Sequence, residues 1–354
     1  MMNRIEKIQR QLLVNNVDAI LITKSENRRY ITGFTGSAGM VLVSHNGATF
    51  ITDFRYGEQA QDEVKVAKIV IHDGNIEQAV AAEIDRQGIQ RIAVEANSMT
   101  LKTFSTLQKY TNAQLVQLEN IIEKVREIKD HLELETMRTA AQIADKTFEY
   151  ILNIIKPGVS EIEIRDELEF YMRRQGASSS SFNIIVASGK RAALPHGVAS
   201  GKIVEYGDMV TLDFGSLYKG YCSDITRTIA VGSCSDEFHS IYHVVLEALK
   251  RGTEGIRSGE KTNTIDDLTR DYITEKGYGH RFGHSTGHGL GLEVHEPLRL
   301  SNISEEILQT GMVVTIEPGI YVPGWGGCRI EDDVIVTENG YEIITHSTKE
   351  LLIL

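Results

Sequence analysis

One seven-residue pattern occurs twice in the second half of the sequence. Residues 209–215 read MVTLDFG and residues 313–319 read VVTIEPG, so both run through apolar residues and a Thr to an acid and then a Gly. Each copy is followed by a second expected strand that carries another acid, in YCSDITRTIAV and in CRIEDDVIV. Internal repeats indicate a chain built from similar units. We therefore predict a domain made of two matched halves, with their acid-bearing hairpins brought together around a pseudo-twofold axis.

The residues in front of this duplicated region predict a second, smaller domain. Residues 3–15 place apolar side chains on one helical face, and DAILIT, GMVLVSH, ATFITD, KIVIH and RIAVEA are typical of short strands with helical stretches between them. A charged segment near residues 121–130 precedes a long helical pattern at 131–155, which KPG ends. We place the boundary near residue 128, which gives domains at 1–128 and 129–354.

The charge balance and the cysteines narrow the class of partner. The chain has 37 basic and 49 acidic residues, a formal net charge of −12, and no dense cluster of Lys and Arg. We therefore expect no nucleic-acid partner. Three cysteines without a CxxC pair, no signal-peptide pattern and no apolar run of about 18 residues predict a cytoplasmic protein with no membrane partner.

Four acids on the two expected hairpins are the strongest functional signal. Asp213 and Glu317 each end an apolar strand, and Asp224 and Glu331 lie on the strands that follow. A buried acid is costly unless something pairs with it, and four together repel one another. A hydrogen-bonded strand end would explain any one of them, and nearby arginines could pair with two. Divalent metal ions account for the whole set, because carboxylate oxygens favour hard ions and an imidazole ligand widens the choice.

Histidines and glycines are interleaved between the two hairpins, in GHSTGHGLGLEVHE at residues 283–296. This segment carries His284, His288 and His295, and its four glycines are expected to leave the backbone open to a ligand or metal. A single histidine is usually a core or surface residue with satisfied hydrogen bonds, but three in one short segment favour a functional cluster. A fourth, His196 in ALPHGVAS, is expected to face the same cleft.

Five motifs in order, LDFG, SDITRT, GHSTGHGLGLEVHE, TIEPGIY and RIEDD, resemble those of the pita-bread metallopeptidases, which include Xaa-Pro dipeptidase (prolidase) and aminopeptidase P. TDFRY at residues 52–56 resembles a motif of the creatinase-type N-terminal domain. The resemblance implies an α+β fold, in which a duplicated pita-bread catalytic domain follows a smaller creatinase-type α/β domain. Asp53 and Arg55 in TDFRY are interpreted as a structural ion pair outside the site.

The resemblance also implies a dinuclear metal centre. Its ligands would be Asp213, Asp224, His288, Glu317 and Glu331. Asp213 would bind one ion, His288 and Glu317 would bind the other, and Asp224 and Glu331 would bind both. Manganese is the expected metal, with cobalt or zinc as alternatives.

Further residues are implied to act on the substrate. Glu317 would shuttle protons as well as bind metal, and His196 and His295 would donate hydrogen bonds to the substrate and to the charge that develops on its carbonyl oxygen. His284 would shape the cleft.

Two arginines are expected on the substrate side of the cleft. Arg299 resembles a prolidase arginine that contacts the substrate's C-terminal carboxylate, although a surface salt bridge would also explain it. Arg329 lies two residues before Glu331 and would orient a ligand carboxylate. Cys328 beside it is interpreted as a small buried thiol and not as a metal ligand.

The expected activity is hydrolysis of the bond before proline at the N-terminus of a peptide, by an Xaa-Pro dipeptidase or an aminopeptidase. This bond is a tertiary amide without an N–H, so proteases that read an extended backbone bind it poorly. The expected partners are proline-containing peptides and a second copy of the chain in a homodimer. The alternatives are a catalytically altered relative, such as a creatinase-like hydrolase that works without metal, and a non-enzymatic binding module.

Overall fold

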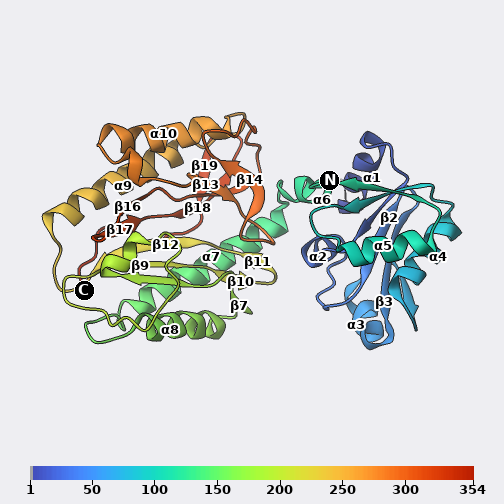
Figure 1. The fold of residues 1–354 in the computed structure, drawn as a ribbon, viewed down its shortest axis with the longest axis horizontal. Coiled ribbons are helices and arrows are strands. Elements are labelled where there is room, and N and C mark those ends of the chain that lie inside the picture. The colour runs from blue at the N-terminus through green and yellow to red at the C-terminus, as the bar shows by residue number, and fades with distance from the viewer. Residues whose placement is uncertain (1–2) are drawn as a thin grey trace. The chain divides into compact units, whose positions relative to one another are not determined.

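The computed structural model describes residues 3–354, which form two compact units, one ending at residue 126 and the other beginning at residue 127. The first unit is built on a mixed six-stranded sheet in the order β4-β3-β2-β1-β5-β6 (Figure 1). Its antiparallel centre is β1-β2-β3, and β4, β5 and β6 add parallel to their neighbours. Its elements are α1 (Arg4–Val14), β1 (Ala19–Ile22), α2 (Ser25–Thr32), β2 (Met40–Ser44), β3 (Gly47–Asp53), α3 (Gly57–Glu63), β4 (Lys68–His72), α4 (Ile76–Gln87), β5 (Arg91–Glu95), α5 (Leu101–Tyr110), β6 (Gln114–Leu118) and α6 (Ile121–Arg126).

The central strands of this unit are buried along most of their length, and one buried cluster joins the sheet to two helices. Leu21 of β1 and Leu42 of β2 pack with Val80 and Ile84 of α4 and with Leu107 of α5 in one buried cluster. Every strand expected from the sequence is present, with helices between several of them as expected, and β6 is an additional strand.

The TDFRY segment lies at the end of β3. Arg55 donates hydrogen bonds to both carboxylate oxygens of Asp53, at 2.8 Å each. The predicted structural ion pair is therefore confirmed.

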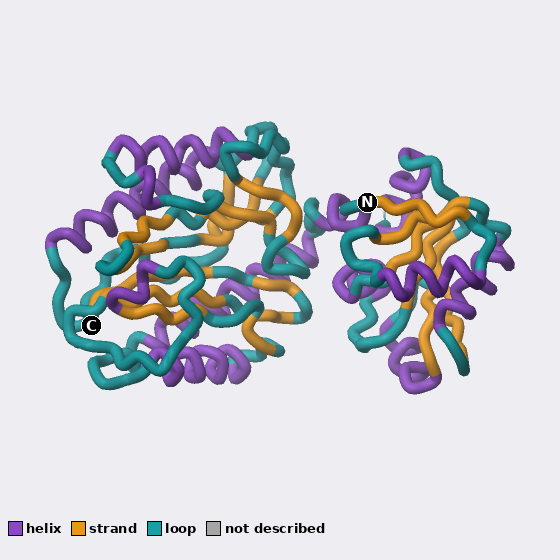
Figure 2. Tube along the Cα trace, viewed as in Figure 1, coloured by secondary structure: helices purple, strands orange, loops and turns teal. Residues whose placement is uncertain are grey.

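The second unit contains two helix pairs and several small sheets (Figures 1 and 2). The strand orders are β12-β9-β8, β11-β10-β7, β14-β13-β15-β18-β19 and β16-β17. Its elements are α7 (His131–Ile151), α8 (Glu161–Arg174), β7 (Ser179–Ser180), β8 (Ile185–Ser188), β9 (Met209–Phe214), β10 (Ser216–Tyr218), β11 (Tyr221–Cys222), β12 (Ile225–Ala230), α9 (Asp236–Gly255), α10 (Thr262–Glu275), β13 (Gly287–Gly289), β14 (Glu296–Leu300), β15 (Val313–Ile316), β16 (Gly319–Val322), β17 (Gly326–Arg329), β18 (Asp332–Val336) and β19 (Tyr341–Ile343).

The duplication predicted from the sequence is visible in this unit. One buried cluster joins α7 and α8 to β8, β9 and β12, and a second joins α9 and α10 to β15 and β18. In Figure 1, α9 and α10 lie on one side of these strands and α8 lies on the other. The antiparallel pair β9–β12 in the first half corresponds to the antiparallel pair β15–β18 in the second.

Helix α7 ends earlier than its sequence pattern predicts. The pattern continues to residue 155, but the helix ends at Ile151. Beyond this point the backbone N–H groups of Asn153 and Ile154 donate to carbonyls three residues back, at 3.1 and 2.9 Å, which is a tighter turn than an α-helix. The apolar pattern continues because Ile155 is buried in the same core after the turn.

Within residues 3–354, no helix has both the length and the apolar character needed to cross a bilayer.

Candidate metal centre

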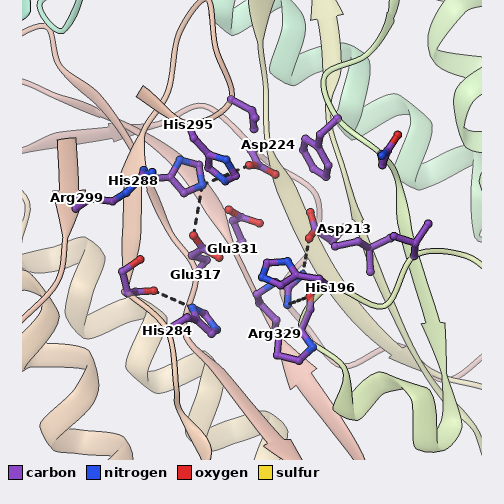
Figure 3. Close-up of a pocket in the computed structure, with 17 residues that line it drawn as sticks. His196, Asp213, Asp224, His284, His288, His295, Arg299, Glu317, Arg329 and Glu331 are labelled. Carbon is purple, nitrogen blue, oxygen red and sulfur yellow. Dashed lines mark hydrogen bonds and ion pairs between the residues drawn. The ribbon is translucent and has the colours of Figure 1, made fainter. Parts of the chain in front are cut away.

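The side chains singled out in the sequence all line one cavity of about 540 Å³ in the second unit (Figure 3). They are His196, Asp213, Asp224, His284, His288, His295, Arg299, Glu317, Arg329 and Glu331. The cavity also has an apolar wall, to which Phe182, Ile185, Pro195, Val198 and Val294 contribute. The chain therefore places its acids, imidazoles and guanidiniums around one space that is large enough for a small ligand.

The two hairpins deliver the four acids in matched positions. Asp224 directly precedes β12 and Glu331 directly precedes β18, so each hairpin presents an acid at the start of its second strand. Asp213 lies near the end of β9, and Glu317 follows the end of β15. Because paired strands fix these positions through the register of their hydrogen bonds, the carboxylates are held in place before any ligand binds.

His288 on β13 faces three of these carboxylates. Its Nε2 lies 3.4 Å from Oε1 of Glu317 and 3.8 Å from Oδ2 of Asp224. Asp224, His288 and Glu331 each offer a ligand atom, and these atoms lie within 4.8 Å of one another. The Nδ1 of His288 is 3.1 Å from the carbonyl oxygen of Gly289, which can only accept. Nδ1 therefore carries the proton, and the lone pair of Nε2 points toward the acids.

Burial and crowding shift the pKa values of this cluster strongly. Burial, reinforced by the neighbouring carboxylates, raises the pKa of Asp224 and of Glu331 well above the ordinary range. Burial also raises the pKa of Glu317 to about 8, although Arg329 opposes the shift. The pKa of His288 falls to about 3, mainly because the ring is buried. The cluster is therefore poorly neutralised by the protein's own charges, which is the condition that a bound cation would relieve.

Arg329, at the end of β17, is the buried cation of the site. Its guanidinium donates a short hydrogen bond to Asp213, and further bonds of 2.7 Å to Oη of Tyr321, 3.0 Å to the carbonyl oxygen of Pro195 and 3.2 Å to Oγ1 of Thr226. Burial opposes its charge, but Tyr321, Asp213 and the other acids raise the pKa of Arg329 further. The charge is therefore permanent, and it fixes Asp213 on one side of the cavity.

The remaining histidines occupy different depths. Nδ1 of His284 lies 2.8 Å from the carbonyl oxygen of Ser285, so Nε2 accepts the 3.0 Å hydrogen bond from Tyr321 Oη. Burial lowers the pKa of His284 to about 4, which keeps it neutral. His295 packs edge-on against His288 with 4.4 Å between ring centroids, and it is exposed to the cavity, as is His196.

Arg299 projects from β14 into the cavity wall. It is exposed, and within the described residues it forms no ion pair; NH1 donates only to the carbonyl oxygen of Glu296, at 3.2 Å. A surface salt bridge, the alternative explanation for this arginine, is therefore not formed. Cys328, by contrast, is fully buried, and burial raises the pKa of its thiol to about 12, as expected for a structural cysteine.

Two of the glycines around the histidines are packed against protein. A Cβ on Gly287 would lie 1.8 Å from the carbonyl oxygen of Thr315, and a Cβ on Gly291 would lie 2.4 Å from Oε1 of Glu296. The expectation that the glycines leave space for a ligand was therefore wrong at these two positions, whereas nothing lies within 4 Å of a Cβ on Gly283. Gly287 lets β13 approach β15 closely beside His288.

Several residues that position the acids were missed in the sequence. Thr226 donates a 2.6 Å hydrogen bond to Oε2 of Glu331, and Asp333 accepts one of 2.9 Å from the backbone N–H of Asp224. Tyr321 joins Arg329 to His284. Thr226, Asp333 and Tyr321 lie inside the motifs quoted in the sequence analysis. Each is a hydroxyl or acidic residue in an otherwise apolar strand, and this pattern could have indicated them.

The comparisons with known proteins agree with this geometry. Residues 135–338 match the family described as metallopeptidase family M24, and residues 4–128 match the creatinase/prolidase N-terminal domain. The chain belongs to the M24 metallopeptidases. The predicted resemblance and the α+β pita-bread fold with its creatinase-type N-terminal domain are thereby confirmed.

The similar M24 proteins include both kinds of Xaa-Pro peptidase. An Xaa-Pro dipeptidase from Bacillus anthracis is 55% identical with a TM-score of 0.98, each chain covered to 99%. An Xaa-Pro dipeptidase from Pyrococcus horikoshii is 39% identical over 99% of both sequences. An X-Pro aminopeptidase from Thermotoga maritima is 37% identical with a TM-score of 0.91, covering 98% of this chain and 100% of the other.

The residues of this M24 protein fit the divalent metal ions that the family implies. Oδ1 of Asp224 is buried and has no hydrogen-bond partner within the described part of the chain, although such atoms are nearly always paired. It belongs to the Asp224–His288–Glu331 cluster, whose oxygen and imidazole donors suit divalent ions.

Proposed function

We propose that this metallopeptidase hydrolyses the bond before proline at the N-terminus of short peptides, using two divalent metal ions. The observation that carries the proposal is the cluster of four carboxylates and one neutral imidazole in one cavity, with too little positive charge from the protein to neutralise it. The relatives named above support the choice of an Xaa-Pro substrate.

The five proposed ligands divide between two ions. Asp213, Asp224, His288, Glu317 and Glu331 would hold the two ions between them. Two divalent cations would balance four carboxylates, which would offset the burial and the mutual repulsion that raise the pKa values of Asp224 and Glu331. When bound, the ions supply Lewis acidity that polarises the scissile carbonyl and activates water. Manganese is the proposed metal, with cobalt or zinc as alternatives.

The other cavity residues act on the substrate. Glu317 lines the cavity beside His288, where it can accept a proton from the attacking water and return it to the leaving nitrogen. His196 and His295 donate hydrogen bonds to the substrate and to the carbonyl oxygen as charge develops on it. His284, held by Tyr321, shapes the floor of the cavity.

We further propose that dipeptides are the preferred substrates. Arg299 lines the cavity with no ion pair to another described residue, so its guanidinium is available for a free carboxylate directly after proline. The apolar wall formed by Phe182, Ile185 and Val198 suits a proline ring or an apolar side chain. The unpaired cysteines among the described residues support a reducing, cytoplasmic location, and the family resemblance supports a homodimer.

The substrate proposal is tested by supplying Mn²⁺ and comparing an Xaa-Pro dipeptide with the matching Xaa-Pro-Yaa tripeptide. We expect hydrolysis of the dipeptide, and we expect Arg299→Met to raise its KM about tenfold to a hundredfold, the usual value of a charge-assisted hydrogen bond. The KM for any residual tripeptide cleavage should be unchanged in this variant. Cleavage of the tripeptide alone would reject the dipeptidase assignment and leave the aminopeptidase.

A further inference from the structure

Glu161, in the first turn of α8, is a buried carboxylate that the proposed chemistry does not use. It is fully buried and it has a complete set of donors. Oε1 accepts hydrogen bonds from the backbone N–H of Ser188 at 2.7 Å and from its hydroxyl at 2.9 Å. Oε2 accepts from the N–H of Ser200 at 3.0 Å and from its hydroxyl at 2.6 Å, and Nε of Arg191 lies 3.0 Å away.

These donors lie at the two ends of one loop. Residues 189–199, the His196 loop, follow β8 after Ser188 and lead to Ser200. They begin with a short 3-10 helix, η2 (Gly189–Ala193), whose Ala192 is buried in the core. Each carboxylate oxygen of Glu161 therefore holds one end of the loop. His196 lies near its tip and lines the cavity (Figure 3).

The residues on either side of His196 are held as well. NH2 of Arg191, which is paired with Glu161, donates a 2.7 Å hydrogen bond to the carbonyl oxygen of Val198. Arg329 donates one of 3.0 Å to the carbonyl oxygen of Pro195. The loop is thus attached to Arg329 at its tip and to Glu161 at its base.

We propose that Glu161 is a positioning residue that fixes the His196 loop so that His196 reaches the substrate. The proposal rests on the proposed function, in which His196 donates a hydrogen bond to the substrate. Leu194, His196 and Val198 of this loop are exposed, and ordering such a segment requires contacts that offset the lost entropy. A fully buried carboxylate with donors from both ends of the loop supplies those contacts. A shift of about 1 Å in a catalytic group can reduce the rate about a hundredfold.

Glu161→Gln is the sharpest substitution, because it keeps the volume and removes one acceptor. Whichever end the new amide nitrogen faces, it meets the N–H of Ser188 or of Ser200 with a donor in place of an acceptor. Arg191 loses its charged partner at the same time. The matched control is Glu163→Gln in the same helix turn, where the carboxylate is exposed and serves only the Ser160 cap.

The first measurement is a double-mutant cycle on the Mn²⁺-loaded enzyme. We expect Glu161→Gln to reduce kcat/KM for an Xaa-Pro dipeptide about tenfold to a hundredfold, with unchanged metal content and with Glu163→Gln within about twofold of wild type. In a His196→Ala background, Glu161→Gln should lower kcat/KM by less than about twofold further, because Glu161 acts through the His196 side chain that this background already lacks. A full additional loss in that background would overturn the proposal, as would wild-type kcat/KM in Glu161→Gln.

The second measurement is limited trypsin digestion, which needs no peptidase activity. Lys190 and Arg191 lie in the loop, and we expect Glu161→Gln to speed cleavage there about tenfold, with other sites unchanged. Uniformly faster cleavage would indicate general destabilisation and contradict the local role. Ser200→Ala removes the hydroxyl's hydrogen bond to Glu161 and the 3.2 Å bond that it accepts from the backbone N–H of Lys202, but it leaves the Glu161 carboxylate in place. It should give a smaller effect at the same site and covers the case in which Glu161→Gln fails to fold. If the wild type cleaves no Xaa-Pro peptide, the proposed function fails, and the digestion still reports on Glu161.

Discussion

Replacing Asp224 by asparagine should abolish metal binding and activity together, without destabilising the metal-free protein. Asp224 is 4% exposed, and one of its oxygens has no hydrogen-bond partner in the described chain. Without metal, the buried charges of Asp224 and Glu331 repel each other, so a neutral amide of the same shape removes a cost. With metal, the same amide would remove one of the proposed ligands.

Two thermal unfolding series separate these effects. One series is recorded without metal and the other with Mn²⁺ about a hundredfold above its Kd. The added Mn²⁺ should raise the free energy of unfolding of the wild type by about 3 kcal/mol and that of Asp224→Asn by almost nothing. Loss of the ions should reduce the hydrolysis rate at least about a thousandfold, which is about 4 kcal/mol of transition-state stabilisation. Asp267→Asn, an exposed acid on α10, is the control for the change in charge. An Asp224→Asn protein that binds two ions and retains activity would contradict the assignment.

Replacing Arg329 by methionine should destabilise the metal-free protein by about 3–5 kcal/mol, the usual cost of leaving a buried charge without its partner. The substitution leaves Asp213 without its cation, and it removes donors from Tyr321 and from the carbonyl oxygen of Pro195. A bound metal ion would take over the neutralisation of Asp213. The loss should therefore be clearly smaller in saturating Mn²⁺.

Urea unfolding with and without Mn²⁺ measures this difference. Arg299→Met is the matched control, because Arg299 lines the same cavity but is exposed and has no ion pair among the described residues. This substitution should lower the free energy of unfolding by less than about 0.5 kcal/mol. Equal destabilisation of Arg329→Met in both conditions would show that Asp213 is not neutralised by metal.

The acids and histidines of the site could be found in the sequence because their chemistry is local. An acid at the end of an apolar strand, such as Asp213 or Glu317, is costly to bury unless it binds a ligand. That cost can be recognised from the sequence without a structure. The duplicated pattern then indicated that the two hairpins belong together. The family resemblance supplied the roles that the pattern could not.

What the sequence could not supply depends on contacts between distant segments. Nothing near Glu161 in the chain indicates that its carboxylate binds Ser188 and Ser200. The same holds for the close approach of Gly287 to Thr315, which overturned the expectation that Gly287 leaves space for a ligand. Helix α7 ends at Ile151, but Ile155 beyond it is buried in the same core, so the apolar pattern did not reveal where the helix ends.

Metal titration of the stripped protein tests the central claim most directly. The protein would be freed of metal with a chelator and titrated with Mn²⁺, with hydrolysis of an Xaa-Pro dipeptide and the bound metal followed in the same samples. We predict no hydrolysis without metal and full activity when two ions are bound per chain. Full activity in the metal-free protein, or metal binding to two sites without any hydrolysis of Xaa-Pro peptides, would contradict the account.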